Sequence, residues 1–540
     1  MPFGRRKRNE TNNQFEGLIG QGTDFENERG MTDLHMDMMS SKKKHSSKKD
    51  SALQNSQEYQ NVQNTLAEVS FGLSNSFTTD VAANEKMMTS MMANYYKLLA
   101  ACEAYINKKS GLSISGRARK NKVKQIQQYA QRDLMGIEQA FHAMKSMSAE
   151  QQRTLTWDEI IHSARMELIE VDDYSDEKMN LGGEAKKGDF VGKKLKEGIF
   201  SPNRKAAHGK TSLTSSSLFD KDDVTTNEAA SNVETNMANR NVATSRVANL
   251  FGVGSLVEQS TNVKVKDKKT GDIREGSLMT LAKGRAARDR NNKDLVPKMK
   301  KLTSVAEREK LAKSKISPTL QKELSSLQVL DYICGQGDRH QDNFFTEEDS
   351  QGRYSHVHGI DNDNSFSTGV EVENIARREG GVLNQQRFIR MVVDSKNNLT
   401  IPHMDKQFAQ NILQIKDDEL RFVLKDLLEE PFIEAALKRL HKLKTAIKNE
   451  LDKGNHSKVF MEDNDWGEDS LEDFLNYSLR RNVIEKVQPE NIFGPNVKSW
   501  NLEAKMDKEE LMEITKGDNY ISALVNEMVG FNERYYRYET

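Results

Sequence analysis

Two polar stretches decide how this sequence is interpreted: DYICGQGDRHQDNFF at residues 331–345 and HGIDNDNSF at residues 358–366. Both combine carboxylate and amide side chains with short apolar runs. Transfer of a phosphoryl group needs metal ions held against the phosphates and a carboxylate that orients the attacking hydroxyl. Mg²⁺ prefers oxygen ligands, usually one or two side chains completed by phosphate and water. The two stretches therefore predict a metal–nucleotide site.

Three residues of these stretches are the main candidates. Asn343 follows Asp338 by five positions, so a turn can present a carboxylate and an amide oxygen on the same side of a cleft. One of them would act on the substrate and the other on a metal ion. The apolar Ile360 brings Asp361 to the end of a strand-like stretch, where its carboxylate can be the principal metal ligand. The 23 residues that separate Asp361 from Asp338 suit a hairpin that folds the second stretch over the first.

The sequence upstream has the pattern of a small nucleotide-holding lobe. Residues 181–202, LGGEAKKGDFVGKKLKEGIFSP, combine glycines with short apolar pairs and predict small strands joined by tight turns. A helix is expected to end at Gly252. Val263 and Val265 then alternate with lysines before the turn KDKKTGD, and the chain resumes at Ile273, which predicts a hairpin.

With this upstream pattern, the order GDRHxxN and then I-D-N resembles the catalytic and metal-binding loops of an atypical kinase superfamily. The superfamily includes phosphatidylinositol kinases, actin-fragmin kinase, the HipA toxin kinases and secretory-pathway kinases, and the chain also resembles a group of proteins of gut Firmicutes. The resemblance covers residues of about 180 to 450. It implies that Asp338 is the catalytic base, that Asn343 and Asp361 bind metal, and that Arg339 and His340 shape the loop. His340 would also lie near the transferred phosphate.

One position departs from the pattern of these relatives. They often hold the nucleotide phosphates with the lysine of a Phe-Lys-Pro sequence, whereas Ser201 stands between Phe200 and Pro202 here. The candidates to replace that cation are Lys194, Lys196, Arg204 and Lys205, with Glu228 or Glu234 as the carboxylate partner. Loss of such a cation costs several kcal/mol of transition-state stabilisation when nothing replaces it, on the order of magnitude of other electrostatic contributions to catalysis.

The predicted fold class is α+β. It consists of a two-lobed kinase-like domain, with a small β-rich N-lobe and a helical C-lobe, and an added helical N-terminal region. Met91, Tyr95 and Leu98 recur at helical spacing, and Thr156 precedes Glu159 by three residues as in a capping box. The expected divisions are a disordered basic and polar arm at 1–57, the helical region at 58–174, the N-lobe at 175–317, the C-lobe at 318–450 and a helical extension at 451–540.

Composition narrows the remaining possibilities. The 540 residues carry 80 basic and 81 acidic side chains, so no nucleic-acid partner is expected, although Arg5 to Arg8 and Lys42 to Lys49 form basic clusters. Two cysteines exclude a disulfide framework. No run reaches the roughly 20 apolar residues of a membrane span, and the start has no secretory signal. A cytoplasmic protein without integral membrane association is expected, although signal-independent export as a bacterial effector leaves no mark in a sequence.

Simpler kinds of site fit the same residues less well. Asp361, Asp363 and Ser365 match the first ligands of an EF-hand loop, but Phe366 replaces its glycine and Val372 its final glutamate. His340, His356 and His358 lack zinc-ligand spacing around them, and the GKK at 192–194 lacks the rest of a phosphate-binding loop. Turn residues that only satisfy backbone donors explain any one of the three candidates, but explain the ordered set poorly.

The sequence therefore predicts an ATP-dependent phosphotransferase with Mg²⁺ or Mn²⁺ as cofactor. A protein hydroxyl is favoured over a lipid as the acceptor, because the sequence shows no membrane-seeking segment. Two alternatives stay open. One is a pseudokinase that works as a scaffold or interaction protein, and the other is an AMP transferase that uses the same cleft.

Overall fold

The computed structural model describes most of the chain between residues 57 and 529. The described residues are 57–108, 114–145, 147–162, 168–171, 174–175, 191–192, 198–202, 237–267, 271, 273–336, 339–366, 399–454, 459–476 and 519–529. They form two compact units that alternate along the chain. Unit 1 takes its residues from 57–175, 191–202 and 259–281, and unit 2 from 237–258 and 282–529. The expected domain boundaries stay a prediction. Residues 1–56 of the expected arm lie outside the described residues.

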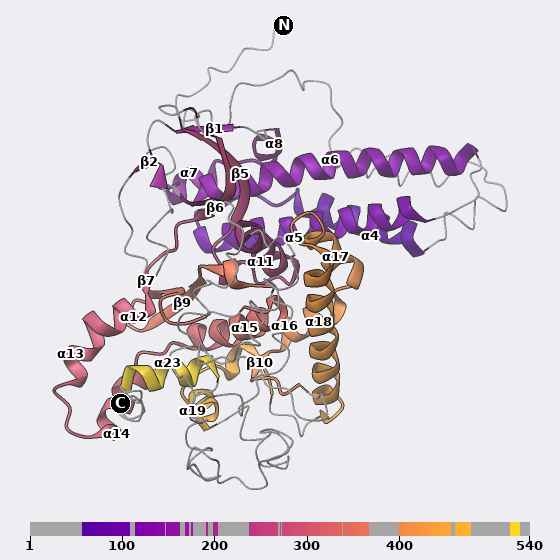
Figure 1. Cartoon of the computed structure of the whole chain (residues 1–540). Helices are drawn as coiled ribbons and strands as arrows, with labels where there is room; N and C mark the ends of the chain where they lie inside the picture. Colours follow the sequence, from indigo (N-terminus) through magenta and orange to yellow (C-terminus); the bar gives the residue numbers. More distant parts are fainter. Residues whose placement is uncertain are drawn as a thin grey trace, which may run out of the picture. The chain divides into compact units, whose positions relative to one another are not determined.

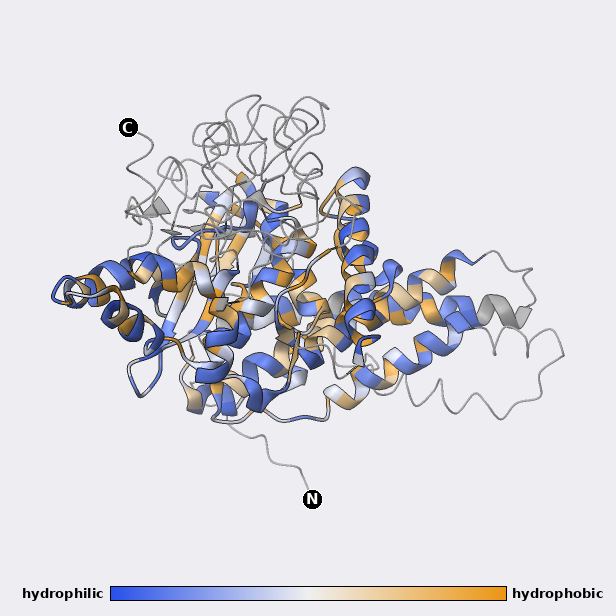
Figure 2. Ribbon diagram, turned by 90° about the horizontal axis from the view of Figure 1, so that it is seen from below, coloured by the Kyte–Doolittle hydropathy of each residue, from blue (hydrophilic) through white to orange (hydrophobic). Residues whose placement is uncertain are grey.

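Unit 1 begins with the helices that the sequence predicts. They are α4 (Gln57–Gly72), α5 (Val81–Asn107), α6 (Ile114–Met144), α7 (Ala149–Arg153) and α8 (Trp157–His162). Tyr95 of α5 donates its hydroxyl to Asp133 of α6 at 3.2 Å, and the apolar side chains of both helices are buried. Figure 2 shows these helices with hydrophobic and polar residues interspersed, as expected when one side packs and the other is solvated. The Thr156 cap is confirmed, since its hydroxyl accepts from the Glu159 N–H at 3.3 Å.

The strands of unit 1 form a four-stranded sheet in the order β1-β5-β6-β4 and a separate pair, β2-β3. Their bounds are β1 Leu168–Val171, β2 Tyr174–Ser175, β3 Val191–Gly192, β4 Gly198–Pro202, β5 Ser260–Asp267 and β6 Ile273–Thr280. The predicted hairpin is confirmed as β5 and β6, which pair antiparallel. Phe200, Val265 and Leu278 form the buried apolar cluster of the sheet, with Val263 packed against it.

Unit 2 is mostly helical, with a three-stranded sheet and a two-stranded one (Figure 1). Its α-helices are α11 (Met237–Leu250), α12 (Ala287–Arg290), α13 (Val296–Met299), α14 (Val305–Lys313), α15 (Pro318–Cys334), α16 (Lys406–Gln414), α17 (Asp417–Leu424), α18 (Glu430–Leu451), α19 (Glu468–Asn476) and α23 (Tyr520–Val529). Its strands are β7 (Arg285–Ala286), β8 (Phe344–Glu348), β9 (Tyr354–Gly359), β10 (Met404–Asp405) and β11 (Phe460–Met461). The mixed α+β class is therefore confirmed.

Helix α15 is the central element of unit 2. Ser317 caps it by accepting from the Leu320 N–H at 3.0 Å, and Pro318 occupies its first turn. Its residues from Leu324 to Cys334 are all buried, because it packs against α11, α18, α23 and β9. A helix surrounded in this way gives the first motif stretch a well-packed starting point.

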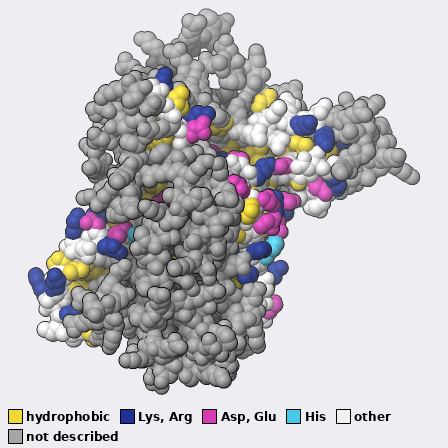
Figure 3. Space-filling view, in the orientation of Figure 1, with side chains coloured by type: hydrophobic (Ala, Val, Ile, Leu, Met, Phe, Trp, Pro, Cys, Tyr) yellow, Lys and Arg dark blue, Asp and Glu magenta, His cyan; other side chains and the backbone are white. Residues whose placement is uncertain are grey.

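The outer helices of unit 2 carry solvated charges. Arg421 of α17 is paired with Glu430 and Glu434 of α18, and His441 lies 2.8 Å from Asp417. Figure 3 shows basic and acidic side chains interspersed over these two helices. No helix in the described part of the chain has the length and apolar character needed to span a bilayer.

Candidate functional site

The first motif stretch leaves α15 through a left-handed turn. Gly335 has φ 62° and ψ 39°, and the Gln336 N–H donates to the carbonyl of Asp331 at 2.8 Å. A Cβ atom at position 335 would lie 2.8 Å from the guanidinium carbon of Arg439, which itself donates to the carbonyl of Ile333 at 3.0 Å. Backbone conformation and space therefore both require glycine here.

Arg339 joins three separate segments of unit 2. Its side chain is buried, and its Nε and Nη2 donate to the two carboxylate oxygens of Asp331, each at 2.9 Å. Nη1 donates to the carbonyls of Asn343 at 2.6 Å and Ile360 at 2.7 Å, and Nη2 to Oδ1 of Asn362 at 2.6 Å. Arginine has five N–H donors in a planar fork, and these five bonds use all of them. These five residues are called the Arg339 cluster below.

The charge of Arg339 is balanced inside the protein. Burial acts to lower the pKa of the guanidinium, but the charge of Asp331 and the hydrogen bonds to it more than offset burial and raise that pKa. Removing one partner of a buried ion pair leaves the other charge uncompensated, which makes such pairs costly to break. Since its donors are all engaged, Arg339 acts on the shape of the loop, the role that the sequence predicts, and has none left for a phosphate.

The hairpin β8–β9 folds the second motif stretch back against the first, as the sequence predicts. Phe344 pairs with Gly359, and one step beyond the sheet the Ile360 N–H donates to the carbonyl of Asn343 at 3.0 Å. The two motif stretches thus meet at the open end of the hairpin, with Asn343 and Asp361 on neighbouring backbone segments.

Asp361 has a left-handed backbone conformation, with φ 53° and ψ 57°. Its carbonyl accepts from Gln336 Nε2 at 3.2 Å, and the next N–H, of Asn362, donates to Oδ1 of Asn241 on α11 at 2.8 Å. The Asp361 side chain is exposed. Left-handed conformations are uncommon outside glycine and cluster at active sites and ligand clamps. The backbone therefore marks Asp361 as a candidate independently of the sequence motif.

The second motif stretch is fixed again a few residues later. Phe366 is fully buried with φ 61°, and its N–H donates to the carbonyl of Cys334 at the end of α15. The carbonyl of Ser365 accepts from Nη1 of the buried Arg240 on α11 at 2.7 Å. The exposed carboxylate of Asp361 is therefore carried by a segment whose backbone is held by α11 and α15 on both sides.

The structure describes three of the predicted site residues. His340 is half-buried, and its Nδ1 accepts from the Asp342 N–H at 3.2 Å. Asn343 is buried, and its N–H donates to the His340 carbonyl at 2.9 Å. Backbone contacts thus bring His340, Asn343 and Asp361 together. The predicted residues that lie outside the described part of the chain are Asp338, Lys194, Lys196, Lys205, Arg204, Glu228 and Glu234.

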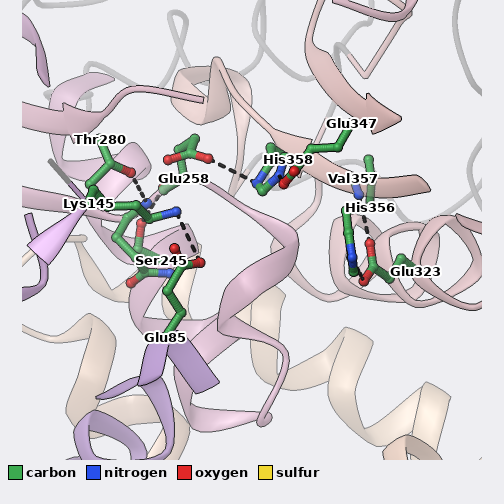
Figure 4. Close-up of polar contacts among 11 residues, drawn as sticks. Glu85, Lys145, Ser245, Glu258, Thr280, Glu323, Glu347, His356, Val357 and His358 are labelled. Atoms are coloured by element: carbon green, nitrogen blue, oxygen red, sulfur yellow. Dashed lines mark hydrogen bonds and ion pairs between the residues drawn. The ribbon is translucent and has the colours of Figure 1, made fainter. Parts of the chain in front are cut away.

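The other two histidines of the zinc interpretation, His356 and His358, have carboxylate partners on separate sides (Figure 4). His358 lies between Glu258, whose Oε1 is 3.1 Å from Nδ1, and Glu347, whose Oε1 is 2.8 Å from Nε2. His356 lies 2.9 Å from Glu323. The hydrogen bond to His358 is the largest cause that lowers the pKa of Glu347. Within the described residues no group of three or more His, Cys, Asp or Glu side chains is arranged to hold a metal ion.

Several residues that build the site were not singled out from the sequence. Asp331 carried a signal, because a carboxylate between the apolar residues Leu330 and Tyr332 of a buried helix requires a partner. Asn362 adjoins the predicted ligand but has no distinguishing pattern. Glu258 lies within ion-pair distance of His358 without an aligned hydrogen bond, and no sequence pattern marks it. Their contacts reach other segments of the fold, from eight residues away for Asp331 and Arg339 to more distant positions for Asn362 and Asn241.

Comparison with known proteins leaves the family open. No protein-family model matches the chain. No curated protein matches it either.

Proposed function

We propose that this protein is an ATP-dependent phosphotransferase of the atypical kinase-like type, acting on a protein hydroxyl. The observation that carries the proposal is the Arg339 cluster. Two of its hydrogen bonds anchor Arg339 to Asp331, and the other three hold the segments of Asn343 and Asp361 against each other. A buried arginine that bonds to two backbone segments fixes the distance between them. The ligands of one metal ion need such a fixed distance, which residues around the ligands usually provide.

The donor atoms fit Mg²⁺ or Mn²⁺. The exposed carboxylate of Asp361 and the amide oxygen of Asn343 are hard oxygen ligands, and a site that binds a nucleotide complex needs only one or two of these from the protein. A metal ion bound there would neutralise charge on the phosphates. Asp338 is the proposed base that orients the acceptor hydroxyl, with His340 beside it in the same loop.

A scaffold role is the second candidate, and Ser201 favours it. Ser201 lies in β4 in register with Ser277 of β6, so two serines meet where the relatives carry a cation. Without another cation near the phosphates, nucleotide could bind while transfer stays slow. Lys194, Lys196 and Arg204 are the proposed replacements, and Glu228 is the proposed carboxylate partner.

Labelled ATP separates these functions. The purified full-length chain is incubated with Mg²⁺ or Mn²⁺, dephosphorylated casein, and ATP labelled on either the α or the γ phosphate. Transfer of γ label to casein or to the chain itself supports the kinase. Transfer of α label supports AMP transfer, and nucleotide binding without any transfer supports the scaffold.

Two matched variants test the site. Asp361→Ala should reduce transfer on the order of 10²-fold or more, because a catalytic metal ion contributes several kcal/mol. Asp363→Ala removes a carboxylate two residues away and should leave the rate within about twofold, as expected for a substitution outside the reacting groups. Full turnover by Asp361→Ala would show that the metal ligands are elsewhere.

A further inference from the structure

Helix α23 is attached to the Arg339 cluster by a hydrogen bond between residues 189 positions apart in sequence. The Tyr520 hydroxyl, at the start of α23, donates to Oδ2 of Asp331 at 2.8 Å. The same oxygen accepts from Nε of Arg339 at 2.9 Å. Tyr520, Asp331 and Arg339 are each 1 % exposed, so water does not compete for these bonds. A directed chain of polar contacts therefore runs from α23 to the segments that carry Asn343 and Asp361.

The start of α23 is held in place by several hydrogen bonds to α15 and α19. The Tyr520 N–H donates to Oε1 of Gln328 on α15 at 3.1 Å. Asn519 and Ser522 both donate to the carbonyl of Phe474 in α19, at 2.8 Å and 2.9 Å. The helix is also buried along most of its length. The Tyr520 hydroxyl is thus a fixed donor rather than a rotating one.

The opposite end of α23 carries a second polar side chain. Glu527 follows Tyr520 by seven residues, which returns to the same face after two helical turns. Its Oε2 is buried and has no hydrogen-bond partner. Burial is the largest cause that raises the Glu527 pKa well above its usual value, while Arg288 opposes and Asp342 reinforces that rise. Arg288 pairs with Asp342 of the motif loop at 2.7 Å. The Glu527 carboxyl is therefore within electrostatic range of Arg288 and Asp342, while Tyr520 on the same helix bonds to Asp331 of α15.

We propose that Tyr520 is a positioning residue for the metal ligands Asn343 and Asp361, acting through Asp331 and Arg339. The hydroxyl supplies the third hydrogen bond to the Asp331 carboxylate and so sets the plane of the Arg339 guanidinium. That plane in turn sets where the carbonyls of Asn343 and Ile360 lie. This inference rests on the proposed function for its catalytic consequence, but the coupling of α23 to the two motif stretches does not depend on it.

The test compares two Tyr→Phe variants of the full-length chain. Tyr520→Phe removes the hydroxyl that donates to Asp331 and keeps the ring. Tyr354→Phe is the matched control, because Tyr354 is equally buried and its hydroxyl has no hydrogen-bond partner. Amide hydrogen exchange is measured over residues 339–343 and 360–366, and in α5 and α6 as an internal reference. Half-saturation by Mn²⁺ is measured with and without ATP.

Tyr520→Phe is expected to speed exchange of the Ile360 and Asn362 amides and to raise half-saturating Mn²⁺ about tenfold, since partners that orient metal ligands typically contribute 10–100-fold to affinity. Tyr354→Phe should change neither quantity. Unchanged exchange in Tyr520→Phe overturns the positioning role, whether or not the wild-type chain binds Mn²⁺. Faster exchange at the two stretches, in a wild-type chain that neither binds Mn²⁺ nor transfers label, supports the coupling and removes the proposed function instead.

Discussion

The apolar cluster of the unit 1 sheet and the Arg339 cluster of unit 2 are both buried, but they are stabilised by opposite kinds of interaction. Phe200, Val265 and Leu278 pack through apolar contact, which has no preferred direction. Arg339 instead makes five directed bonds to Asp331, Asn343, Ile360 and Asn362. Apolar packing tolerates exchange of similar volumes, whereas a buried polar group left without its partner destabilises strongly. Ligands of a metal ion need the second kind of support.

The largest effect should come from breaking the polar cluster. Arg339→Met keeps most of the side-chain volume but leaves the buried Asp331 without its cation, so it should lower the free energy of unfolding by about 3–5 kcal/mol. Urea denaturation at pH 7 measures this. Arg353→Met is the control, because Arg353 pairs with Asp349 on a partly exposed turn and such pairs contribute about 1 kcal/mol or less. Equal losses in the two variants would contradict the cluster's special role.

A smaller loss is expected from the apolar cluster. Leu278→Ala should destabilise unit 1 by about 2–3 kcal/mol, at the low end for buried leucine because some of the side chain is exposed. Leu278→Met should cost less than about 1.5 kcal/mol, since it conserves volume. Leu281→Ala, at a position 37 % exposed, is the matched surface control. Thermal unfolding compares the stability of the three variants. A loss for Leu278→Met as large as that for Leu278→Ala would mean that the apolar cluster does not tolerate a side chain of similar volume.

Two glycines with left-handed backbones, one in the turn after α15 and one between β5 and β6, offer a sharper comparison. Gly335→Ala should cost about 2 kcal/mol, because a left-handed alanine costs roughly 1–2 kcal/mol and its Cβ also meets the Arg439 guanidinium. Gly271→Ala has a similar φ of 76° but open space around it, and should cost about 1 kcal/mol from the backbone alone. Chemical denaturation measures both. If Gly335→Ala costs no more than Gly271→Ala, the Arg439 side chain can move away from the new Cβ without loss of stability.

The smallest expected effect concerns pH. The hydrogen bond to Glu323 is the largest cause that raises the pKa of His356 above its usual value of 6.5. A raised folded-state pKa contributes stability that is fully present below pH 6.5 and is lost as pH rises through the raised pKa. His356 has φ 41°, so His356→Asn removes the charge and retains a residue that tolerates this backbone. Because the pair is half-exposed, the wild-type advantage should be under about 1 kcal/mol at pH 5.5.

Denaturation at pH 5.5, 7 and 9 follows that advantage, which should vanish by the highest pH. His441→Asn is a useful reference, since His441 also pairs with a carboxylate, Asp417, but on exposed helices away from the hairpin. An advantage that grows with pH would have the wrong sign for this pair.

Local patterns predicted the elements because their causes are local. The Thr156 cap, the helix before Gly252 and the β5–β6 hairpin each depend on residues within a few positions of one another, and each is confirmed. The hairpin that joins the two motif stretches was also predictable, since its turn and strands are contiguous. Asp331 gave a partial signal, as a charge on an apolar helix, without indicating its partner.

Contacts over long sequence separations could not be predicted in the same way. Nothing near Tyr520 distinguishes it from any other tyrosine, and its link to Asp331 exists only because α23 packs on α15. The left-handed backbone of Asp361 is likewise set by two other segments: Gln336 donates to the Asp361 carbonyl, and Asn241 accepts from the next N–H, of Asn362.

The sequence by itself determined which side chains offer oxygen ligands to the proposed site, since carboxylate and amide oxygens are properties of Asp338, Asn343 and Asp361 wherever they lie. It also determined the helices, strands and turn that surround them, because short-range backbone preferences act before any tertiary contact forms. Only the tertiary structure decided that all the N–H donors of Arg339 bond to groups within the protein and that α23 contacts the same cluster. The physical reason is that a hydrogen bond depends on the distance and angle between two groups, and these are set by the packing of the whole unit.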